Sequence, residues 1–500
     1  MKNNAKKEKN PAAEASVPEF EIKNFGPIAQ GKIQLKNLTI FIGPNSSGKS
    51  YAAMLIKAFY DALADENAPR RLRMGQLATK LGQNLISNDY AWENFDQEKL
   101  RNDLLSLTAD EEYRIENSII HQELKESLKK LMEETLINSL NDTFASKTGK
   151  LSRYGNHRMS LSYKLGEETI SFLEKYDNLF IEEIDLSPVN IYIRLTNKNE
   201  YPDNQYRIEK TLTEYKIVII LTREAIESSQ NLIKDFIKSA TPIYITSLIH
   251  KLYRTTHYLP AFRAGLLSVR KELSSALIRK KEVTDTAGVI REFLGDLEGI
   301  VPDVKKEFFK KGREAEKNLT GGEIIINDQS FGSYNLTYKK GSMEIPISNA
   351  SSTVNEIAPL VIYLKHIVSP GDILVIEEPE SSLHPAAQRE MARLIASLVR
   401  SGLKILITTH SDYLLEQLGN LVMMSGLDQK RRRERYGTEL YLAPEEVSAY
   451  LFKYNNRNKA YRIEELPVTG KDGISMEEQT RVAEELYDES VNLESDIEES

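Results

Sequence analysis

The most informative stretch of the chain, residues 38–50, reads Leu38-Thr39-Ile40-Phe41-Ile42-Gly43-Pro44-Asn45-Ser46-Ser47-Gly48-Lys49-Ser50. Its first five residues predict a buried strand, and the residues from Ser50 onward predict a helix. Between them, residues 43–50 fit the phosphate-binding pattern G-x-x-x-x-G-K-[ST] in the strand–loop–helix context that this pattern requires. All the residues of this loop are therefore predicted to bind a nucleotide.

The chemistry of the loop explains why these residue types occur together. Glycines let the backbone wrap with its N–H groups turned inward, and the helix N-terminus adds partial positive charge. We expect Lys49 to reach the β- and γ-phosphates of ATP and the Ser50 hydroxyl to hold Mg²⁺. A glycine-rich turn without a ligand is the alternative, and the adjacent strand, lysine and serine favour nucleotide binding over it.

Composition limits the classes of protein that this chain can belong to. Its 500 residues carry a net charge of −8, which argues against a wholly basic nucleic-acid binder but leaves room for a local basic groove. There is no cysteine, which excludes disulfides and thiolate metal sites. No apolar run approaches the roughly 20 residues that cross a bilayer, and residues 1–17 lack an apolar signal core. We expect a soluble, cytoplasmic protein with no membrane partner.

Alternating and helical patterns divide the chain. Residues 20–25 and 31–35 predict two antiparallel strands ahead of the loop, residues 160–208 predict further strands, and residues 97–140 and 211–254 predict helices. We expect an α/β core with a large, mostly helical lobe inserted between its two parts. The expected division is a disordered tail (1–17), the first part of the core (18–67), the inserted lobe (68–345), the second part of the core (346–465), and a C-terminal helix with an acidic tail (466–500).

A second apolar run ends in carboxylates. Residues 373–378 read Ile373-Leu374-Val375-Ile376-Glu377-Glu378, as expected for a parallel strand buried on both faces. Ligands bind outside the carboxyl ends of such strands. We predict that Glu377 binds Mg²⁺ and that Glu378 is the general base that activates water. Two solvated acids at a strand end are the alternative, which is weakened by the Pro-Glu-Ser-Ser-Leu-His-Pro segment that follows.

A third apolar run, residues 404–409, ends at His410-Ser411. A lone histidine is usually a satisfied core or loop residue. Here it closes the strand that follows the carboxylate strand, which favours a hydrogen bond from His410 to the γ-phosphate.

In combination, these segments resemble the ABC-type ATPases of the SMC/RecF/OLD branch, and most closely their OLD-like members with an AAA domain. The resemblance rests on a P-loop, a carboxylate strand and a switch histidine in the right order, together with Ile22–Pro27, Tyr258–Arg263, Ser381–Pro385 and Glu446–Phe452. It covers both ends of the chain well and the middle poorly. It implies an ABC-type, RecF/SMC-like head that binds ATP and Mg²⁺ in a site shared by at least two copies of the chain.

One segment departs from that family pattern. The family completes its ATP site with a Ser followed by Gly from a second subunit, and the candidate here is Ala350-Ser351-Ser352-Thr353. Ser352 can still donate a hydroxyl to the γ-phosphate, whereas Thr353 adds a side chain where glycine is expected. An ordinary Ser/Thr helix cap is nearly as good a reading. The glutamine that contacts the metal in this family is not identified, with Gln76 and Gln83 as the candidates.

The resemblance leaves more than one biological role open. About 90 residues follow His410, no D-x-D pair occurs, and seven histidines are scattered along the chain, so we expect no nuclease of its own. This favours a scaffold ATPase that controls a separate nuclease, as in the two-component anti-phage systems PARIS and Septu. The alternative is a RecF/SMC-like clamp in DNA repair or maintenance, with the basic run at residues 430–435 as a phosphate-contacting patch and DNA as a partner.

Overall fold

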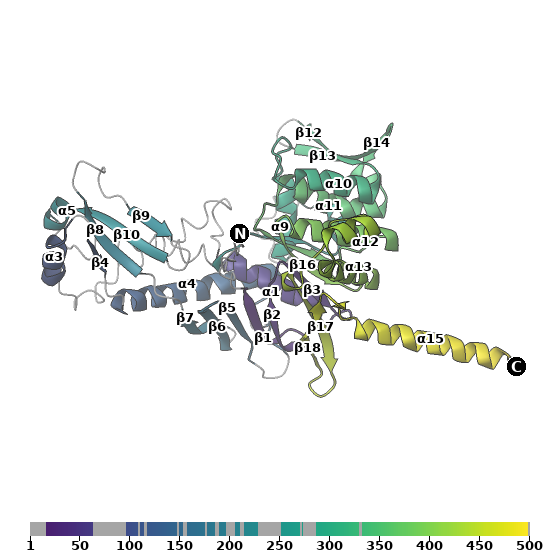
Figure 1. The fold of residues 1–500 in the computed structure, drawn as a ribbon, viewed down its shortest axis with the longest axis horizontal. Helices are drawn as coiled ribbons and strands as arrows, with labels where there is room; N and C mark the ends of the chain where they lie inside the picture. Colours follow the sequence, from purple (N-terminus) through teal and green to yellow (C-terminus); the bar gives the residue numbers. More distant parts are fainter. Residues whose placement is uncertain are drawn as a thin grey trace, which may run out of the picture.

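A computed structural model provides the structure of the protein. It describes residues 17–63, 97–108, 111–114, 118–147, 150–153, 158–175, 178–185, 190–196, 206–210, 215–228, 252–270, 273, 287–329 and 333–498. The described residues form an 11-stranded sheet and three smaller sheets, with helices on both faces of the large one (Figure 1).

Five parallel strands form one end of the large sheet. Their order is β11-β15-β16-β3-β17, and each pairs in parallel with its neighbour. The sequence-based prediction of the strands around the loop and the carboxylates is confirmed. The bounds are β3 (Leu38–Ile42), β11 (Thr256–Leu259), β15 (Ile373–Glu377), β16 (Lys404–Thr409) and β17 (Val447–Asn455).

These strands are unbroken apolar runs because both of their faces are buried. In β3, Leu38 and Ile40 point into one hydrophobic core and Phe41 points into the other. In β15, Val375 and Ile376 divide between the two cores in the same way. Successive side chains of a strand point to opposite faces, so each strand contributes to both cores, and burial of each aliphatic side chain stabilises the fold by about 1.5–3 kcal/mol.

The rest of the large sheet is mostly antiparallel and continues through β18, β2, β1, β5, β6 and β7. Its strands come from widely separated parts of the chain, so β5, β6 and β7 belong to the same sheet as β3, the strand before the loop. How the chain divides into domains stays a prediction. The bounds are β18 (Ala460–Leu466), β2 (Ile28–Gln34), β1 (Glu19–Phe25), β5 (Ser160–Leu165), β6 (Glu168–Lys175) and β7 (Asn178–Asp185).

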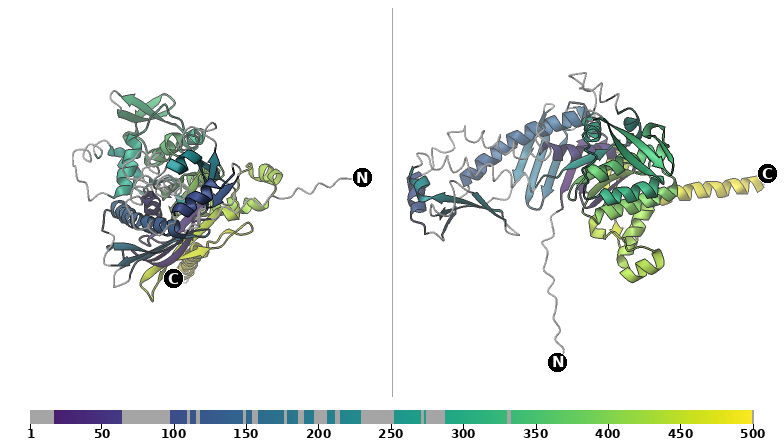
Figure 2. Two further views of the ribbon diagram at one scale, coloured as in Figure 1. Left: turned by 90° about the vertical axis from the view of Figure 1, so that its left-hand side faces the viewer. Right: turned by 90° about the horizontal axis from the view of Figure 1, so that it is seen from above.

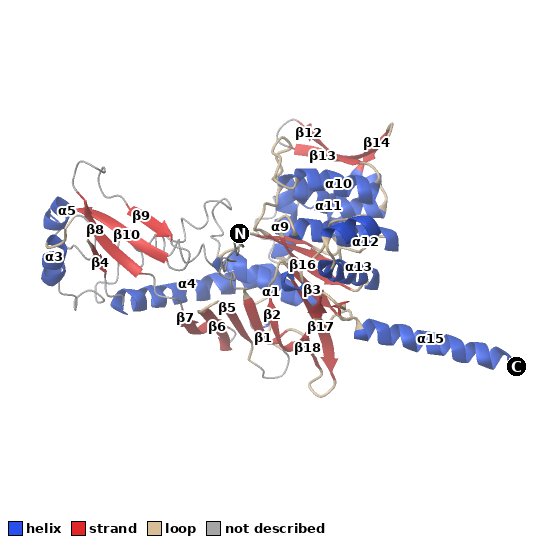
Figure 3. Cartoon of the chain, viewed as in Figure 1, coloured by secondary structure: helices blue, strands red, loops and turns tan. Residues whose placement is uncertain are grey.

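Helices cover the sheet on both faces, as the layout in Figure 3 shows. On one face, α1 (Lys49–Ala62) packs against α4 (Ser118–Phe144). The opposite face carries α9 (Gly288–Glu298), α10 (Phe309–Thr320), α11 (Ser352–His366), α12 (Pro385–Val399) and α13 (Asp412–Met423). The short helix α7 (Arg263–Ser268) follows β11 and contacts α11.

A separate part lies at the far end of α4, to the left in Figure 1. It contains a four-stranded sheet flanked by two helices, and the right-hand view in Figure 2 also shows it apart from the large sheet. Residues 215–222 form a strand where we expected a helix, because the run Ile-Val-Ile-Ile is β-branched and favours extended backbone. The bounds are α3 (Gln97–Leu105), β4 (Glu112–Arg114), β8 (Asn190–Thr196), β9 (Tyr206–Lys210), β10 (Tyr215–Thr222) and α5 (Arg223–Ser228).

The remaining elements lie near the second part of the core. A three-stranded sheet packs beside α10, and a basic helix and a C-terminal helix complete the chain. Among the described residues, no helix combines the length and apolarity needed to cross a membrane. The bounds are β12 (Glu323–Gln329), β13 (Ser333–Lys340), β14 (Met343–Pro346), α14 (Gln429–Tyr436), β19 (Val468–Thr469), β20 (Gly473–Ile474) and α15 (Glu477–Glu498).

Candidate ATP site

The loop at residues 43–50 joins β3 directly to α1, as predicted. Two of its glycines are required by the packing of neighbouring segments. Gly43 has φ +145°, and a Cβ there would lie 2.8 Å from the Phe452 carbonyl oxygen of β17. Gly48 has φ +101°, and a Cβ there would lie 2.9 Å from side-chain atoms of Pro27 and Ile28. The loop therefore keeps its shape only with glycine at both positions.

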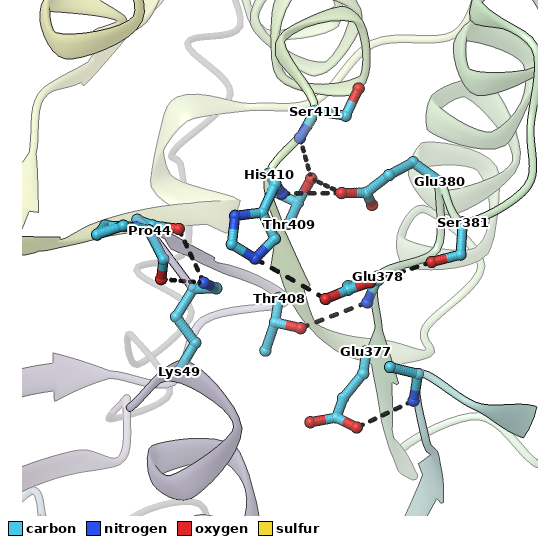
Figure 4. A network of polar contacts seen from close by, with 12 residues as sticks. Pro44, Lys49, Glu377, Glu378, Glu380, Ser381, Thr408, Thr409, His410 and Ser411 are labelled. Carbon is cyan, nitrogen blue, oxygen red and sulfur yellow. Dashed lines mark hydrogen bonds and ion pairs between the residues drawn. The ribbon is translucent and has the colours of Figure 1, made fainter. Parts of the chain in front are cut away.

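Lys49 lies in the first turn of α1 and turns back over the loop. Its Nζ donates hydrogen bonds to the carbonyl oxygens of Gly43, at 2.8 Å, and Pro44, at 2.9 Å (Figure 4). Burial lowers the pKa of Lys49 to about 8, and the charges of Glu378, Glu380 and Glu377 oppose that shift. The amine is thus held at the loop by weak acceptors that phosphate oxygens can replace.

The loop has the features of an anion site. No acidic residue occupies the first turn of α1, so nothing in the helix itself competes for its positive end. Ser47 Oγ is buried and has no hydrogen-bond partner among the described residues. Ser50 lies half-buried in the first turn of the same helix. These residues fit the triphosphate that the motif predicts.

The carboxyl end of β15 places Glu377 and Glu378 in different environments. Glu377 is buried, and its Oε2 accepts a hydrogen bond from the backbone N–H of Ala261 at 3.0 Å. Glu378 has φ +44°, an unusual backbone conformation for a residue other than glycine. Its N–H donates to the Thr408 carbonyl oxygen of β16 at 2.9 Å. The two neighbouring acids therefore project in different directions from one strand end (Figure 4).

His410 faces Glu378 from the end of β16. Its Nε2 lies 3.8 Å from Glu378 Oε1, and the Ser381 hydroxyl donates to Glu378 Oε2 at 3.2 Å. Burial lowers the pKa of His410, and the charge of Lys49 lowers it further while Glu378 opposes the shift. A histidine with a pKa below its usual value of about 6.5 is neutral at pH 7, so its ring has one N–H donor and one acceptor.

Glu380 fixes the backbone that carries His410. Its Oε1 accepts hydrogen bonds from Thr409 Oγ1 at 2.7 Å and from the His410 N–H at 2.8 Å. Burial raises the pKa of Glu380, and these two hydrogen bonds oppose the shift. We did not single out Glu380 as a site residue from the sequence, although it belongs to the Glu-Glu-Pro-Glu run.

The structure therefore brings Lys49, Glu377, Glu378 and His410 to the same edge of the sheet, with Ser50 on the adjoining helix. Among the described residues there is no cluster of three or more acidic or histidine side chains that could hold a metal by itself. Mg²⁺ is commonly held by one or two protein ligands together with substrate phosphates and water. Glu377 and Ser50 fit that requirement.

The segment around Ser352 forms the N-terminus of α11 and makes a different set of contacts from the four residues above. Ser351 caps α11, its side chain accepting from the Val354 N–H, so the helix-cap reading is correct for that residue. Ser352 begins the helix and is exposed. Among the described residues it makes no hydrogen bond to the phosphate loop. Thr353 Oγ1 donates to the Ser382 carbonyl oxygen at 3.0 Å, which ties this helix end to the segment after β15.

Two further points concern sequence-based candidates. Gln76 and Gln83 lie outside the residues that the structure describes. Arg263 is buried beside the end of β15, and the sequence pattern indicates it only as part of the Tyr258–Arg263 segment. No spacing rule links it to Glu377, because the two residues are far apart in the chain.

A protein family described as an AAA ATPase domain matches residues 17–415. The chain belongs to this AAA ATPase family. The match extends from the first described strand to the helix after His410, so it includes the phosphate loop, both carboxylates and the histidine. The protein is accordingly an ATPase with an α/β P-loop core. Comparison with curated proteins gives no match.

Several solved structures are remotely similar to this ATPase. An SMC head bound to the C-terminal winged-helix domain of ScpA is 12% identical, with a TM-score of 0.36 over 90% of this chain and 98% of that one. The SMC head domain from Thermotoga maritima is 10% identical, with a TM-score of 0.35 over 91% and 100%. An Smc head with an extended coiled coil, bound to the C-terminal domain of ScpA derived from Pyrococcus furiosus, is 12% identical, with a TM-score of 0.37 over 94% and 99%.

Proposed function

We propose that this ATPase is a Mg²⁺-dependent switch whose ATP site is completed by a second copy of the chain, and that it controls a partner effector. The observation that carries the proposal is the convergence of Lys49 and the Glu378–His410 pair at the carboxyl ends of three adjacent parallel strands. Hydrolysis of a bound triphosphate requires a cation that binds the phosphates and a carboxylate that can accept a proton from water, and both lie at this edge of the sheet.

The residues divide the chemistry among them. Lys49 and the N–H groups of the Gly43–Ser50 loop would bind the β- and γ-phosphates. Glu377 and Ser50 would hold Mg²⁺, which, when bound, neutralises charge on the phosphate oxygens. Glu378 would accept a proton from the attacking water, and neutral His410 would donate a hydrogen bond to the γ-phosphate.

A second copy of the chain would supply the group that closes over the γ-phosphate. Ser352 lies exposed at the N-terminus of α11, where its hydroxyl and the free N–H groups of the helix can receive an anion. In a head-to-tail pair, each Ser352 would close over the γ-phosphate held by the other copy. ATP would then join two copies, and hydrolysis would release them.

An exposed helix supports control of a partner. Six large apolar side chains of α15 are exposed, and the helix projects away from the large sheet (Figure 1). Its charges are almost all acidic, which suits a partner with an apolar groove bordered by basic residues. We infer that the partner is a nuclease in anti-phage defence, following the resemblance of the sequence to OLD-like ATPases. The six residues are Val482, Leu486, Tyr487, Val491, Leu493 and Ile497.

The test is the Glu378→Gln variant, which keeps the shape of the side chain and removes the base. We expect ATP turnover to fall by at least about 100-fold and an ATP-bound dimer to accumulate in light scattering, because general-base catalysis typically contributes that much. Glu390→Gln is the matched control, because Glu390 is a half-exposed glutamate of α12 that pairs with Arg393, and this variant should turn over normally. Normal turnover by Glu378→Gln, or no gain of dimer with ATP, would refute the proposal. Co-purification of the neighbouring gene product with this variant would identify the effector.

A RecF/SMC-like DNA clamp remains the second candidate because α14 exposes basic side chains. Lys430, Arg431 and Arg433 have 80%, 68% and 69% exposed side chains. Each of them already contacts a carboxylate of the same chain, which favours a solvated surface over a DNA patch. DNA-stimulated hydrolysis that falls steeply with salt would support the clamp, and hydrolysis indifferent to DNA would support the effector switch.

A further inference from the structure

Arg263 is among the most deeply buried charged residues of the described chain, with 1% of its surface exposed. It begins α7, three residues after Pro260. Its guanidinium has five N–H donors, and it makes four hydrogen bonds and one ion pair. An isolated buried charge strongly destabilises a fold, so such a residue persists only where its partners compensate for lost water.

Two of these partners are the backbone carbonyls of the two site carboxylates. Arg263 Nη1 donates to the Glu377 oxygen at 2.6 Å, and Nη2 donates to the Glu378 oxygen at 3.2 Å. These oxygens belong to the peptide planes on either side of the Glu378 Cα. The Glu378 N–H is held from the opposite strand by the Thr408 carbonyl at 2.9 Å. The backbone torsions φ and ψ of Glu378, which set the direction of its side chain, are thereby constrained.

These hydrogen bonds hold Glu378 in a strained backbone conformation. A residue other than glycine at φ +44° is strained and persists only where its surroundings hold it. Without the two guanidinium hydrogen bonds, the peptide planes could relax toward ordinary extended backbone. The carboxylate would then point away from its place beside His410.

The remaining partners of Arg263 are the Pro260 carbonyl oxygen, at 3.2 Å from Nη1, and Glu356 on α11. Arg263 Nη2 lies 2.8 Å from Glu356 Oε1, and Nε donates to the Glu356 carbonyl oxygen at 3.1 Å. Burial raises the pKa of Glu356, and the charge of Arg263 opposes the shift. Glu356 follows Ser352 by four residues, so the two side chains lie on one face of the helix, one turn apart.

We propose that Arg263 is a positioning residue that holds Glu378 in its reactive orientation and, through Glu356, ties that orientation to the Ser352 end of α11. The hydrogen bond from Thr353 to the Ser382 carbonyl is a second link between the same two segments. Contact of a second copy with Ser352 is thus transmitted to the general base of the same chain. This inference rests on the roles proposed above for Glu378 and Ser352.

The inference is tested with Arg263→Lys, which keeps a buried cation but cannot bridge two carbonyls and a carboxylate at once. Arg270→Lys is the matched control, because Arg270 is also buried and donates to the Tyr334 carbonyl, away from the site. We expect Arg263→Lys to lower kcat by at least about tenfold while the Kd for a fluorescent ATP analogue stays within about threefold. Arg270→Lys should lower the melting temperature and leave kcat within about twofold.

A double variant separates positioning from general stability. In the Glu378→Gln background the base is absent, so adding Arg263→Lys should change the residual rate by less than about twofold. An equal loss of rate in both backgrounds would assign Arg263 a structural role and overturn the inference. A fully active Arg263→Lys would overturn it as well and leave the proposed function intact. A fully active Glu378→Gln would refute the proposed function and this inference together.

Discussion

The phosphate loop and the N-terminus of α11 are both helix starts that can receive an anion, and they are built differently. At the loop, Lys49 is held by hydrogen bonds to two carbonyls, and the charges of three glutamates favour its cationic form. At α11, Ser351 caps the helix and Ser352 stays exposed. The loop has its phosphate-binding lysine in place within one chain. The exposed Ser352 has no anion-binding partner group beside it among the described residues of the same chain. Under the proposed function, this difference would make binding of ATP and closure over ATP separate events.

Among the variants of the phosphate loop, Lys49→Ala should lower ATP affinity the most. The variant removes the cation that we propose binds the β- and γ-phosphates, so we expect ATP affinity to fall by at least about 100-fold, with hydrolysis lost in consequence. Equilibrium titration with a fluorescent ATP analogue measures this directly. Retention of tight binding would mean that the loop is not the ATP site, and the comparison between the two helix starts would fail.

The affinity for ATP should also depend on pH, by a smaller factor, through Lys49 of the phosphate loop and not through α11. Burial lowers the pKa of Lys49 to about 8, and only its cationic form attracts phosphate. The Kd for ATP should therefore be constant below about pH 8 and rise by up to about tenfold for each pH unit above it. Lys49→Arg stays charged and should show a flat profile over the same range. A rise of equal size in Lys49→Arg would assign the titration to another group.

The strands of the core could be predicted because their chemistry is local. Residues 38–42, 373–377 and 404–409 are unbroken apolar runs, and burial on both faces demands such runs. The family match and the fold confirm the P-loop ATPase class that these runs indicated. Residues 215–222 were misassigned to a helix because an aliphatic run fits either structure until its β-branched content is weighed.

The support around the site could not be predicted in the same way. Ala261 and Arg263 reach Glu377 and Glu378 across more than 110 residues of sequence. The β11–β15 pairing creates those contacts, and no pattern within either segment specifies it. The roles of Lys49, Glu377, Glu378, His410 and Ser352 remain predictions, which the structure makes testable by placing four of them at one edge.

The central claim, a site shared by two copies, is tested most directly by mixing two inactive variants. Lys49→Ala cannot bind its own ATP, and Ser352→Arg should bind ATP but block closure over the ATP of a second copy. In a mixed pair, one site joins the intact loop of the second variant to the intact Ser352 of the first. Equal mixing should restore ATP turnover to at most about one quarter of the wild-type rate, since about half of the pairs are mixed and each has one intact site of two. Loss of the link from Ser352 to Glu378 in the Ser352→Arg chain would lower the restored rate below that limit. A mixture that hydrolyses ATP no faster than the sum of its separate components would contradict the claim.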